Sequence, residues 1–269
     1  MKIILNKNKL INLIQKEKNL GFIPTMGAIH LGHISLVKKS LSQCNKTIVS
    51  IFINKPQFNR KSDFNKYPRI IKKDISLLRK SKVDFIFMPS HREIYPEGHN
   101  KKIKINSFGK KLCGKFRPGH FEAVVDVIDR FIKIINPKKI YFGEKDMQQL
   151  IIINDFIKKR YNNIKVIGSK TIREKCGIPY SSRNFLLSKK EKEIASKIYK
   201  TIIFNKRKLI LKKISIKNIK SQIFKFGVNK IDYIKILDIN KIIKPNKKVN
   251  KYKIFIAYYL IRTRLIDNI

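Results

Sequence analysis

The stretch PTMGAIHLGHISL, residues 24–36, lies between a short apolar run, Gly21–Thr25, and a helix-length segment, Ile34–Ser42. It contains no charged side chain, although the chain has 62 Lys and Arg residues, and it holds two of the five histidines. An apolar run, then glycines, then a helical segment predict a strand that turns at Gly27 into a helix starting near His33.

The same alternation continues through the first two-thirds of the chain. The predicted strands are Gly21–Thr25, Thr47–Ile53, Val83–Met88, Lys139–Phe142 and Lys165–Ile167. The predicted helices are Ile34–Ser42, Lys72–Lys80, Ala123–Ile135 and Gln148–Tyr161. Nearly continuous apolar strands alternating with helices predict a doubly wound parallel α/β sheet. Ligands bind such sheets beyond the carboxyl ends of the strands, where PTMGAIHLGH, NKPQF and FGEKD all lie.

The pattern changes after about residue 172. Lys189–Ile203 reads as a helix, and Tyr233–Ile239 and Ile254–Leu260 read as strands. We therefore expect two domains, 1–171 and 172–269, the second a small α+β domain that has the Ser181–Asn184 loop near its start.

Composition limits the class of protein. At 269 residues with 43% apolar residues, the chain can build a hydrophobic core. The longest apolar run, Ile254–Ile261, is shorter than the roughly 20 residues that span a bilayer, and the N-terminus lacks a secretory signal pattern. Cys44, Cys113 and Cys176 fit neither a disulfide framework nor a zinc ligand set. We expect a cytoplasmic protein that does not bind membranes.

The formal net charge of +44 attracts polyanions in general. However, the lysines are spread along the whole chain instead of forming one block. Isoleucine, lysine and asparagine, which are all abundant here, have AT-rich codons, so biased base composition accounts for most of the charge. We expect no specific nucleic-acid partner.

The turn in residues 24–36 is suited to anions. Unpaired amide N–H groups and the helix dipole favour negative charge at a helix N-terminus, and Gly27 and Gly32 allow close approach of the backbone. His30 and His33 are three residues apart and can face the same side. They could bond phosphate oxygens during phosphoryl or nucleotidyl transfer. A histidine pair that only caps a helix is the more common meaning of an arbitrary HxxH, and a metal site is the least favoured reading.

Longer motifs distinguish these readings. PTMGAIHLGHISLV resembles the nucleotide-binding signature of the pantothenate synthetases (pantoate–β-alanine ligases), within the HxGH nucleotidylyltransferase superfamily. The resemblance continues in order through VSIFINKPQFN, YPR at 67–69, YPEG at 95–98, RPGHFEAVVDVI, YFGEKDMQQL, IREKCGIPYSSRN and TRLIDNI. These blocks cover nearly the entire chain.

The resemblance implies a Rossmann-like domain that binds ATP and pantoate, followed by a small C-terminal lid domain. It also implies a reaction in which ATP converts (R)-pantoate to pantoyl adenylate and β-alanine then displaces AMP to give pantothenate. Mg²⁺ held mainly by the ATP phosphates is implied too, with Asp74 as a weak candidate for a role beside the metal. A homodimer is implied, for which we expect Thr47–Ile53 in the contact region.

The resemblance assigns roles residue by residue. His33 is the expected catalytic residue. The expected ATP-binding residues are Met26, Gly27, Ala28, Ile29, His30, Leu31, Gly32, His33, Gly143, Glu144, Lys145, Asp146, Ile172, Tyr180, Ser181, Ser182 and Arg183. Gln57 and Gln149 are expected to bind pantoate or β-alanine, and Arg117 and His120 to border that pocket. Gln148 should point elsewhere, because successive helical residues are about 100° apart.

Two other functions remain as alternatives. A different HxGH nucleotidylyltransferase would also release pyrophosphate, but it has no evident need for Gln57 and Gln149. An RNA-binding or tRNA-synthetase-like protein is disfavoured by the dispersed lysines and by the lack of room for an anticodon-binding domain.

Overall fold

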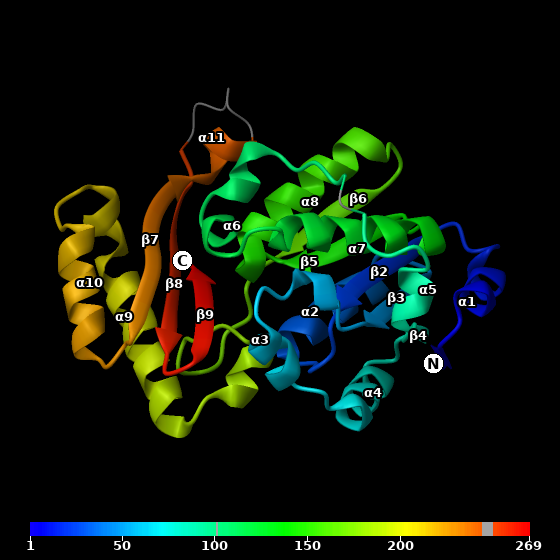
Figure 1. Cartoon of the computed structure of the whole chain (residues 1–269), viewed down its shortest axis with the longest axis horizontal. Helices are drawn as coiled ribbons and strands as arrows, with labels where there is room; N and C mark the ends of the chain where they lie inside the picture. Colours follow the sequence, from blue (N-terminus) through cyan, green and yellow to red (C-terminus); the bar gives the residue numbers. More distant parts are fainter. Residues whose placement is uncertain (101, 244–249) are drawn as a thin grey trace. The chain divides into compact units, whose positions relative to one another are not determined.

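The computed structural model describes residues 1–100, 102–243 and 250–269 (Figure 1). The chain folds as two units, Met1–Ile172 and Arg173–Ile269. Their expected roles, an ATP- and pantoate-binding domain and a lid, stay predictions.

The first unit is built on a parallel sheet. Within the described residues this sheet has six strands in the order β1-β4-β3-β2-β5-β6, and every neighbouring pair is parallel. The strands are β1 (Lys2–Ile4), β2 (Leu20–Thr25), β3 (Lys46–Ile51), β4 (Phe85–Phe87), β5 (Lys139–Gly143) and β6 (Lys165–Ser169). The predicted doubly wound parallel sheet is confirmed, and β1 adds an edge strand that was not predicted.

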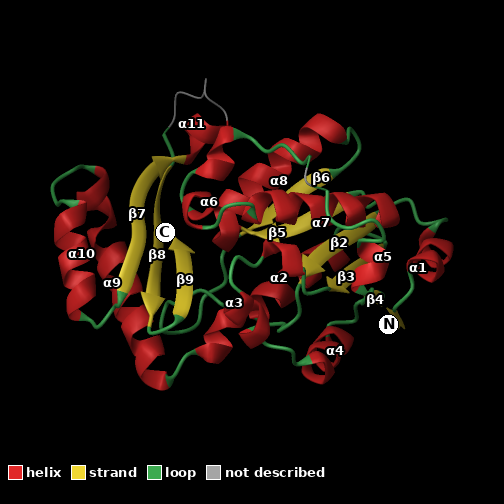
Figure 2. Ribbon diagram, viewed as in Figure 1, coloured by secondary structure: helices red, strands yellow, loops and turns green. Residues whose placement is uncertain are grey.

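Helices cover both faces of this sheet (Figure 2). The helices are α1 (Lys7–Ile14), α2 (Leu31–Leu41), α3 (Lys61–Lys66), α4 (Ile71–Lys80), α5 (His91–Ile94), α6 (Cys113–Phe116), α7 (His120–Ile135) and α8 (Met147–Arg160). Neighbouring strand residues point to opposite faces. Phe22 therefore packs with apolar residues of α1, α7 and α8, whereas Ile23 packs with those of α2 and α4.

Strand β3 corrects one expectation. It lies between β4 and β2, and Thr47, Ile48, Val49 and Ser50 are completely buried. The expectation that Thr47–Ile53 forms a dimer contact is therefore wrong for the strand itself. An apolar run looks the same in a sequence whether it is covered by a partner or by the chain's own helices.

The second unit combines helices with an antiparallel sheet. Its elements are α9 (Lys189–Ile210), α10 (Ile216–Lys225), β7 (Lys230–Asp238), α11 (Ile239–Ile243), β8 (Tyr252–Leu260) and β9 (Thr263–Asn268). The strand order is β7-β8-β9. Ile202 of α9 and Ile219 of α10 pack in one core with Ile254 and Ile256 of β8. The predicted α+β character is confirmed, although α10 and β9 were not predicted.

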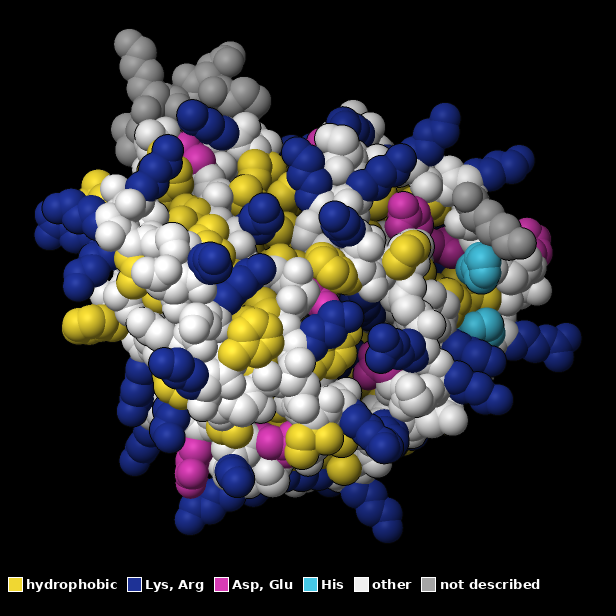
Figure 3. Space-filling model, turned by 60° about the vertical axis from the view of Figure 1, so that its left-hand side comes forward, with side chains coloured by type: hydrophobic (Ala, Val, Ile, Leu, Met, Phe, Trp, Pro, Cys, Tyr) yellow, Lys and Arg dark blue, Asp and Glu magenta, His cyan; other side chains and the backbone are white. Residues whose placement is uncertain are grey.

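Within the described residues, no helix is both long and apolar enough to cross a membrane. Lys and Arg side chains are spread over the face of the molecule that Figure 3 shows, and they do not form a single stripe there.

Candidate functional site

Three loops of the first unit meet at one edge of the parallel sheet. They follow β2, β3 and β5, which are adjacent in the order β3-β2-β5. Because parallel strands end at the same edge, these loops lie together, as the positions of PTMGAIHLGH, NKPQF and FGEKD predicted. The site is built from these loops.

The loop after β2 makes a tight turn. Gly27 has φ of +78° and Ala28 has φ of +50°. A Cβ atom on Gly27 would lie 2.9 Å from Asp74 Oδ2 and 3.2 Å from Ile51 Cγ2. Both the left-handed backbone and the lack of space therefore require glycine at position 27.

Asp74, on α4, holds this loop. Its Oδ2 accepts a hydrogen bond from the backbone N–H of Ala28 at 2.8 Å, and its Oδ1 accepts one from Ile29 at 2.7 Å. The side chain is buried, and burial raises the pKa of its carboxyl above the ordinary value, while the two backbone hydrogen bonds act in the opposite direction. Both oxygens thus serve the loop backbone, a role that the sequence did not indicate and that differs from the expected one beside a metal.

His30 and His33 form a stacked pair, with ring centroids 4.0 Å apart. Helix α2 begins at Leu31, earlier than predicted, so His30 is the N-cap residue and His33 lies in the first turn. Nδ1 of His33 is buried and has no hydrogen-bond partner among the described residues. The pair thus stands where the helix dipole favours anions.

Burial keeps both imidazoles uncharged. It lowers the pKa of His33 to about 4; the Asp146 carboxylate opposes this fall and the Lys145 ammonium adds to it. Burial, then the neighbouring His33 ring and the Lys145 ammonium, lower the pKa of His30 to about 2. At neutral pH each ring therefore has one N–H group to donate and one nitrogen to accept.

The loop after β5 supplies charged groups beside this pair. Glu144–Asp146 forms a single 3₁₀ turn that leads into α8. Lys145 Nζ lies 3.3 Å from Asp146 Oδ1, and the lysine side chain is the more buried of the two. Both charges act on the His33 imidazole, so this loop lies near the start of α2.

Gln57 joins the third loop to the first. It ends a short 3₁₀ helix, Lys55–Gln57, and its Nε2 donates to Met26 Sδ at 3.0 Å. Its Oε1 accepts from Asn54 Nδ2 at 3.2 Å. The amide is therefore oriented with nitrogen towards Met26.

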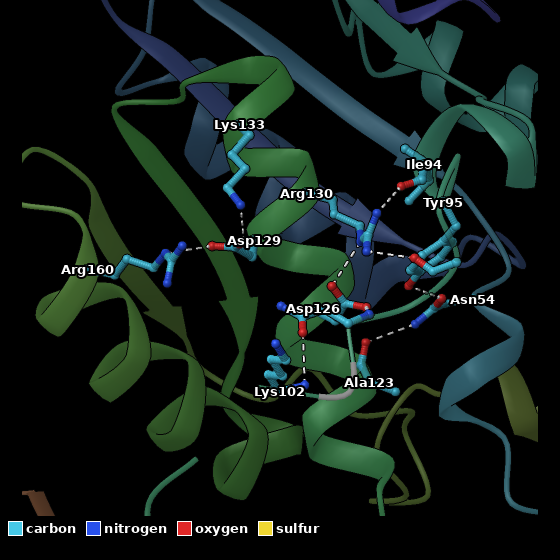
Figure 4. Close-up of polar contacts among 12 residues, drawn as sticks. Asn54, Ile94, Tyr95, Lys102, Ala123, Asp126, Asp129, Arg130, Lys133 and Arg160 are labelled. Atoms are coloured by element: carbon cyan, nitrogen blue, oxygen red, sulfur yellow. Dashed lines mark hydrogen bonds and ion pairs between the residues drawn. The ribbon is translucent and has the colours of Figure 1, made fainter. Parts of the chain in front are cut away.

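Asn54 is itself held by two partners (Figure 4). Its side chain is buried; Oδ1 accepts from the Tyr95 hydroxyl at 2.7 Å, and Nδ2 also donates to the Ala123 carbonyl at 3.1 Å. Burial raises the pKa of the Tyr95 phenol, so it stays protonated and donates. The sequence analysis missed both residues, although Asn54 lies in NKPQF and Tyr95 in YPEG.

An ion pair on α7 supports Tyr95 from the other side. Arg130 donates to Asp126 Oδ1 at 2.9 Å and to the Ile94 carbonyl at 2.8 Å, and its guanidinium lies 4.5 Å from the centre of the Tyr95 ring. Figure 4 shows Arg130 between Asp126 and Tyr95. Helix α7 thus fixes the YPEG segment, and through it Asn54 and Gln57.

Two glutamines, Gln148 and Gln149, lie at the start of α8. Gln148 is buried, donates to the carbonyls of Phe108 and Lys111, and accepts from the Cys113 N–H at 3.0 Å. This confirms that Gln148 points elsewhere. Gln149 is half-buried on the first turn. Its pairing with Gln57 at a pantoate site stays a prediction.

The remaining predicted site residues lie at the end of the first unit and in the second. Ile172 is the last residue of the first unit and is exposed. Tyr180, Ser181, Ser182 and Arg183 lie in the second unit, where Ser181 Oγ accepts from the Arg183 N–H at 3.3 Å. Their contact with nucleotide stays a prediction.

An ion pair that the sequence analysis did not assign anchors the segment that leads to residues 180–183. Arg173 donates to Asp267 of β9 at 2.7 and 2.9 Å. Asn184 donates to Glu174 Oε1 at 2.9 Å. Asp267 belongs to the TRLIDNI block, so that block holds this segment in place.

Comparison with known proteins gives one consistent result. The family model described as pantoate-beta-alanine ligase matches residues 2–269. A pantothenate synthetase from Sulfurihydrogenibium sp. is 39% identical over 279 residues, covering 100% of this chain and 99% of the relative.

Solved structures agree. The structure of pantoate-beta-alanine ligase from Francisella tularensis, complexed with beta-gamma ATP and beta-alanine, is 36% identical with a TM-score of 0.85, covering 100% of this chain and 97% of that one. A pantothenate synthetase from Thermus thermophilus is 30% identical with a TM-score of 0.89, covering 100% and 99%.

Proposed function

Because the chain belongs to the pantoate–β-alanine ligase family, we propose that it condenses pantoate with β-alanine at the expense of ATP, giving pantothenate, AMP and pyrophosphate. The family match over nearly the whole chain carries this proposal. The Francisella tularensis relative, whose complex contains an ATP compound and β-alanine, supports the two substrates. The neutral histidine pair at the start of α2 supports the place of the nucleotide.

In the first step, a pantoate carboxylate oxygen attacks the α-phosphorus of ATP. The bond from that phosphorus to the bridging oxygen breaks, and pyrophosphate leaves with the electron pair. Holding both reactants in one site removes much of the entropic barrier. In the second step, the amine of β-alanine attacks the acyl carbon, AMP leaves, and the amine loses a proton.

His33 is the proposed catalytic residue. As a neutral imidazole it donates its N–H to a phosphate oxygen, and this bond strengthens as negative charge develops in the transition state. His30, Lys145 and the first amides of α2 add donors for the phosphates. Ser181, Ser182 and Arg183 of the second unit are proposed to complete the phosphate site, with Arg183 offering a planar fork of donors.

Gln57 is the proposed pantoate ligand, together with Gln149. Its Nε2 donates one N–H to Met26 and its Oε1 accepts one bond from Asn54, so the second N–H and the second lone pair are the groups that it can offer to substrate. An N–H donor suits a carboxylate or hydroxyl oxygen of pantoate.

Mg²⁺ is proposed to arrive with ATP, bound mainly by phosphate oxygens and water. Among the described residues, no group of three or more His, Cys, Asp or Glu side chains could hold a metal ion. We also propose a homodimer and a cytoplasmic location.

The test is ATP–pyrophosphate exchange. We expect exchange that requires pantoate and proceeds without β-alanine, with net AMP release only when β-alanine is added. Exchange that ignores pantoate would indicate a different nucleotidylyltransferase and overturn the proposal.

A variant pair tests the place of the reaction. His33→Ala should lower the exchange rate by about 10²–10³-fold, the usual cost of losing a transition-state donor. His99→Ala, which alters an exposed histidine, should leave exchange unchanged. Equal rates in the two variants would remove His33 from the mechanism.

A further inference from the structure

We propose that Arg117 and His120 are positioning residues for pantoate recognition, which act through the main-chain oxygen of Gln57. This inference rests on the proposed function, because it concerns the same substrate. The sequence analysis expected these two side chains only to border the pocket.

The two side chains and the Gln57 oxygen form a closed set of contacts. His120 Nδ1 lies 2.9 Å from the Gln57 main-chain oxygen, and an Arg117 guanidinium nitrogen lies 3.1 Å from the same atom. The other terminal nitrogen of Arg117 lies 3.0 Å from His120 Nε2.

These contacts determine the proton positions. A carbonyl oxygen can only accept, so Nδ1 of His120 carries the hydrogen. A guanidinium can only donate, so Nε2 accepts. His120 is therefore a neutral imidazole with the proton on Nδ1, and the Gln57 oxygen receives two hydrogen bonds, one of them from a charged donor.

The RPGH turn brings the two side chains together. Gly119 has φ of +76°, and the N–H of His120 donates to the Arg117 carbonyl at 3.2 Å. His120 then begins α7 and is buried. The same turn is tied to the Gln57 segment at a second point, because Asn59 donates to the Pro118 carbonyl at 2.7 Å.

Gln57 needs this support because its own element is short. The 3₁₀ helix Lys55–Gln57 is a single turn with hydrogen bonds of 3.3 and 3.1 Å at its end. Such turns have poorer hydrogen-bond geometry than α-helices. The position of the Gln57 amide therefore depends on what holds its main chain.

Loss of the hydrogen bonds from Arg117 and His120 should weaken the binding of pantoate but not that of ATP. Within the described residues, Gln57 is hydrogen-bonded to the loop that carries His30 and His33 only through Met26. The backbone of that loop at Ala28 and Ile29 is held by Asp74, which neither Arg117 nor His120 supports. Displacement of Gln57 should therefore raise the KM for pantoate while leaving the KM for ATP in place.

The experiment compares four variants in pantoate-dependent exchange. His120→Leu removes both ring nitrogens. His120→Asn keeps an N–H donor near the position of Nδ1, because the amide nitrogen of asparagine and Nδ1 of histidine are both bonded to Cγ. Arg117→Met removes the charged donor from a partly exposed site. Lys115→Gln, which changes an exposed charge shortly before the RPGH turn, is the control.

We expect His120→Leu and Arg117→Met to raise the KM for pantoate about tenfold, in line with the loss of one hydrogen bond. With His120→Asn the KM for pantoate should stay within about threefold of the wild-type value, and Lys115→Gln should leave it unchanged. In all four variants the KM for ATP should stay within about twofold of the wild-type value, because Asp74 supports the loop that carries His30 and His33.

Three results would overturn the inference: an unchanged pantoate KM in His120→Leu and Arg117→Met, a parallel rise in both KM values, or His120→Asn as impaired as His120→Leu. Thermal melting identifies any variant that fails to fold. If His120→Leu fails to fold, the KM values of Arg117→Met and His120→Asn test the inference. Loss of pantoate dependence in the wild type would instead contradict the proposed function.

Discussion

At the scale of a single residue, burial makes His33 a base that resists protonation. In the unfolded chain a histidine takes up a proton near pH 6.5, but in the folded protein the pKa of His33 is about 4. Between these values the unfolded state binds more protons, so this residue makes the protein less stable as the pH falls through that range.

The variant His33→Asn should remove this dependence. Between pH 7 and pH 5 the free energy of unfolding should fall in both proteins. We expect the fall to be smaller in the variant, by roughly 2 kcal/mol. Denaturant unfolding at the two pH values measures the difference. Parallel losses in both proteins would show that His33 is not held neutral by the fold.

Some residues of the candidate site could be predicted from the sequence, and others could not. The HxGH motif was sufficient to place His30 and His33 at a helix start beside the FGEKD loop, because strand ends and helix starts follow from local patterns. Asp74 and Asn54 were not recognised as supports of the site. Their partners include residues far along the chain, and no local periodicity encodes such a pairing.

At the scale of an element, α4 has a function beyond covering the sheet, because it carries Asp74. Asp74→Asn keeps the size of the side chain but leaves only one oxygen to accept from two N–H groups. We expect a loss of about 1–3 kcal/mol in the free energy of unfolding, the cost of an unsatisfied buried donor. The KM for ATP should rise about tenfold, because the loop that precedes α2 loses its support.

Chemical denaturation and exchange kinetics measure the two effects. Glu193→Gln, which changes an exposed carboxylate on α9, is the matched control and should alter neither. If Asp74→Asn behaved like this control, the two hydrogen bonds to the loop would have no energetic importance.

The elements themselves were largely predictable, with informative exceptions. Long amphipathic segments such as α7 and α9 were found, since several turns of helix give a clear period. Strand β1 has three residues, too few to show a pattern, and is fixed by pairing with β4. Helix α2 begins earlier than predicted. Its N-cap residue is His30, and histidine is uncommon at that position, so no local signal marks the start of the helix.

At the scale of the whole molecule, the positive charge is poorly compensated at the surface. Only 18 acidic residues face 62 basic ones, and several acids lie inside, as Asp126, Asp129 and Asp267 do in their ion pairs. The lysines on the outside therefore repel one another, and this repulsion weakens as salt shortens the Debye length from about 30 Å at 0.01 M to about 10 Å at 0.1 M.

We expect the melting temperature to rise by several degrees between 0.01 M and 0.1 M sodium chloride, because repulsion among exposed charges is released on unfolding. Differential scanning calorimetry measures this change. A melting temperature independent of ionic strength would mean that the dispersed lysines do not strain the folded state.

The contacts of Asp74 with Ala28 and Ile29 span 46 and 45 positions along the chain, respectively. During translation, both imidazoles leave the ribosome well before the carboxylate that secures their loop. A nascent chain that ends ahead of position 74 thus displays the signature motif without the support that shapes it. The proposed nucleotide site therefore gains its support late, when α4 packs against the loop.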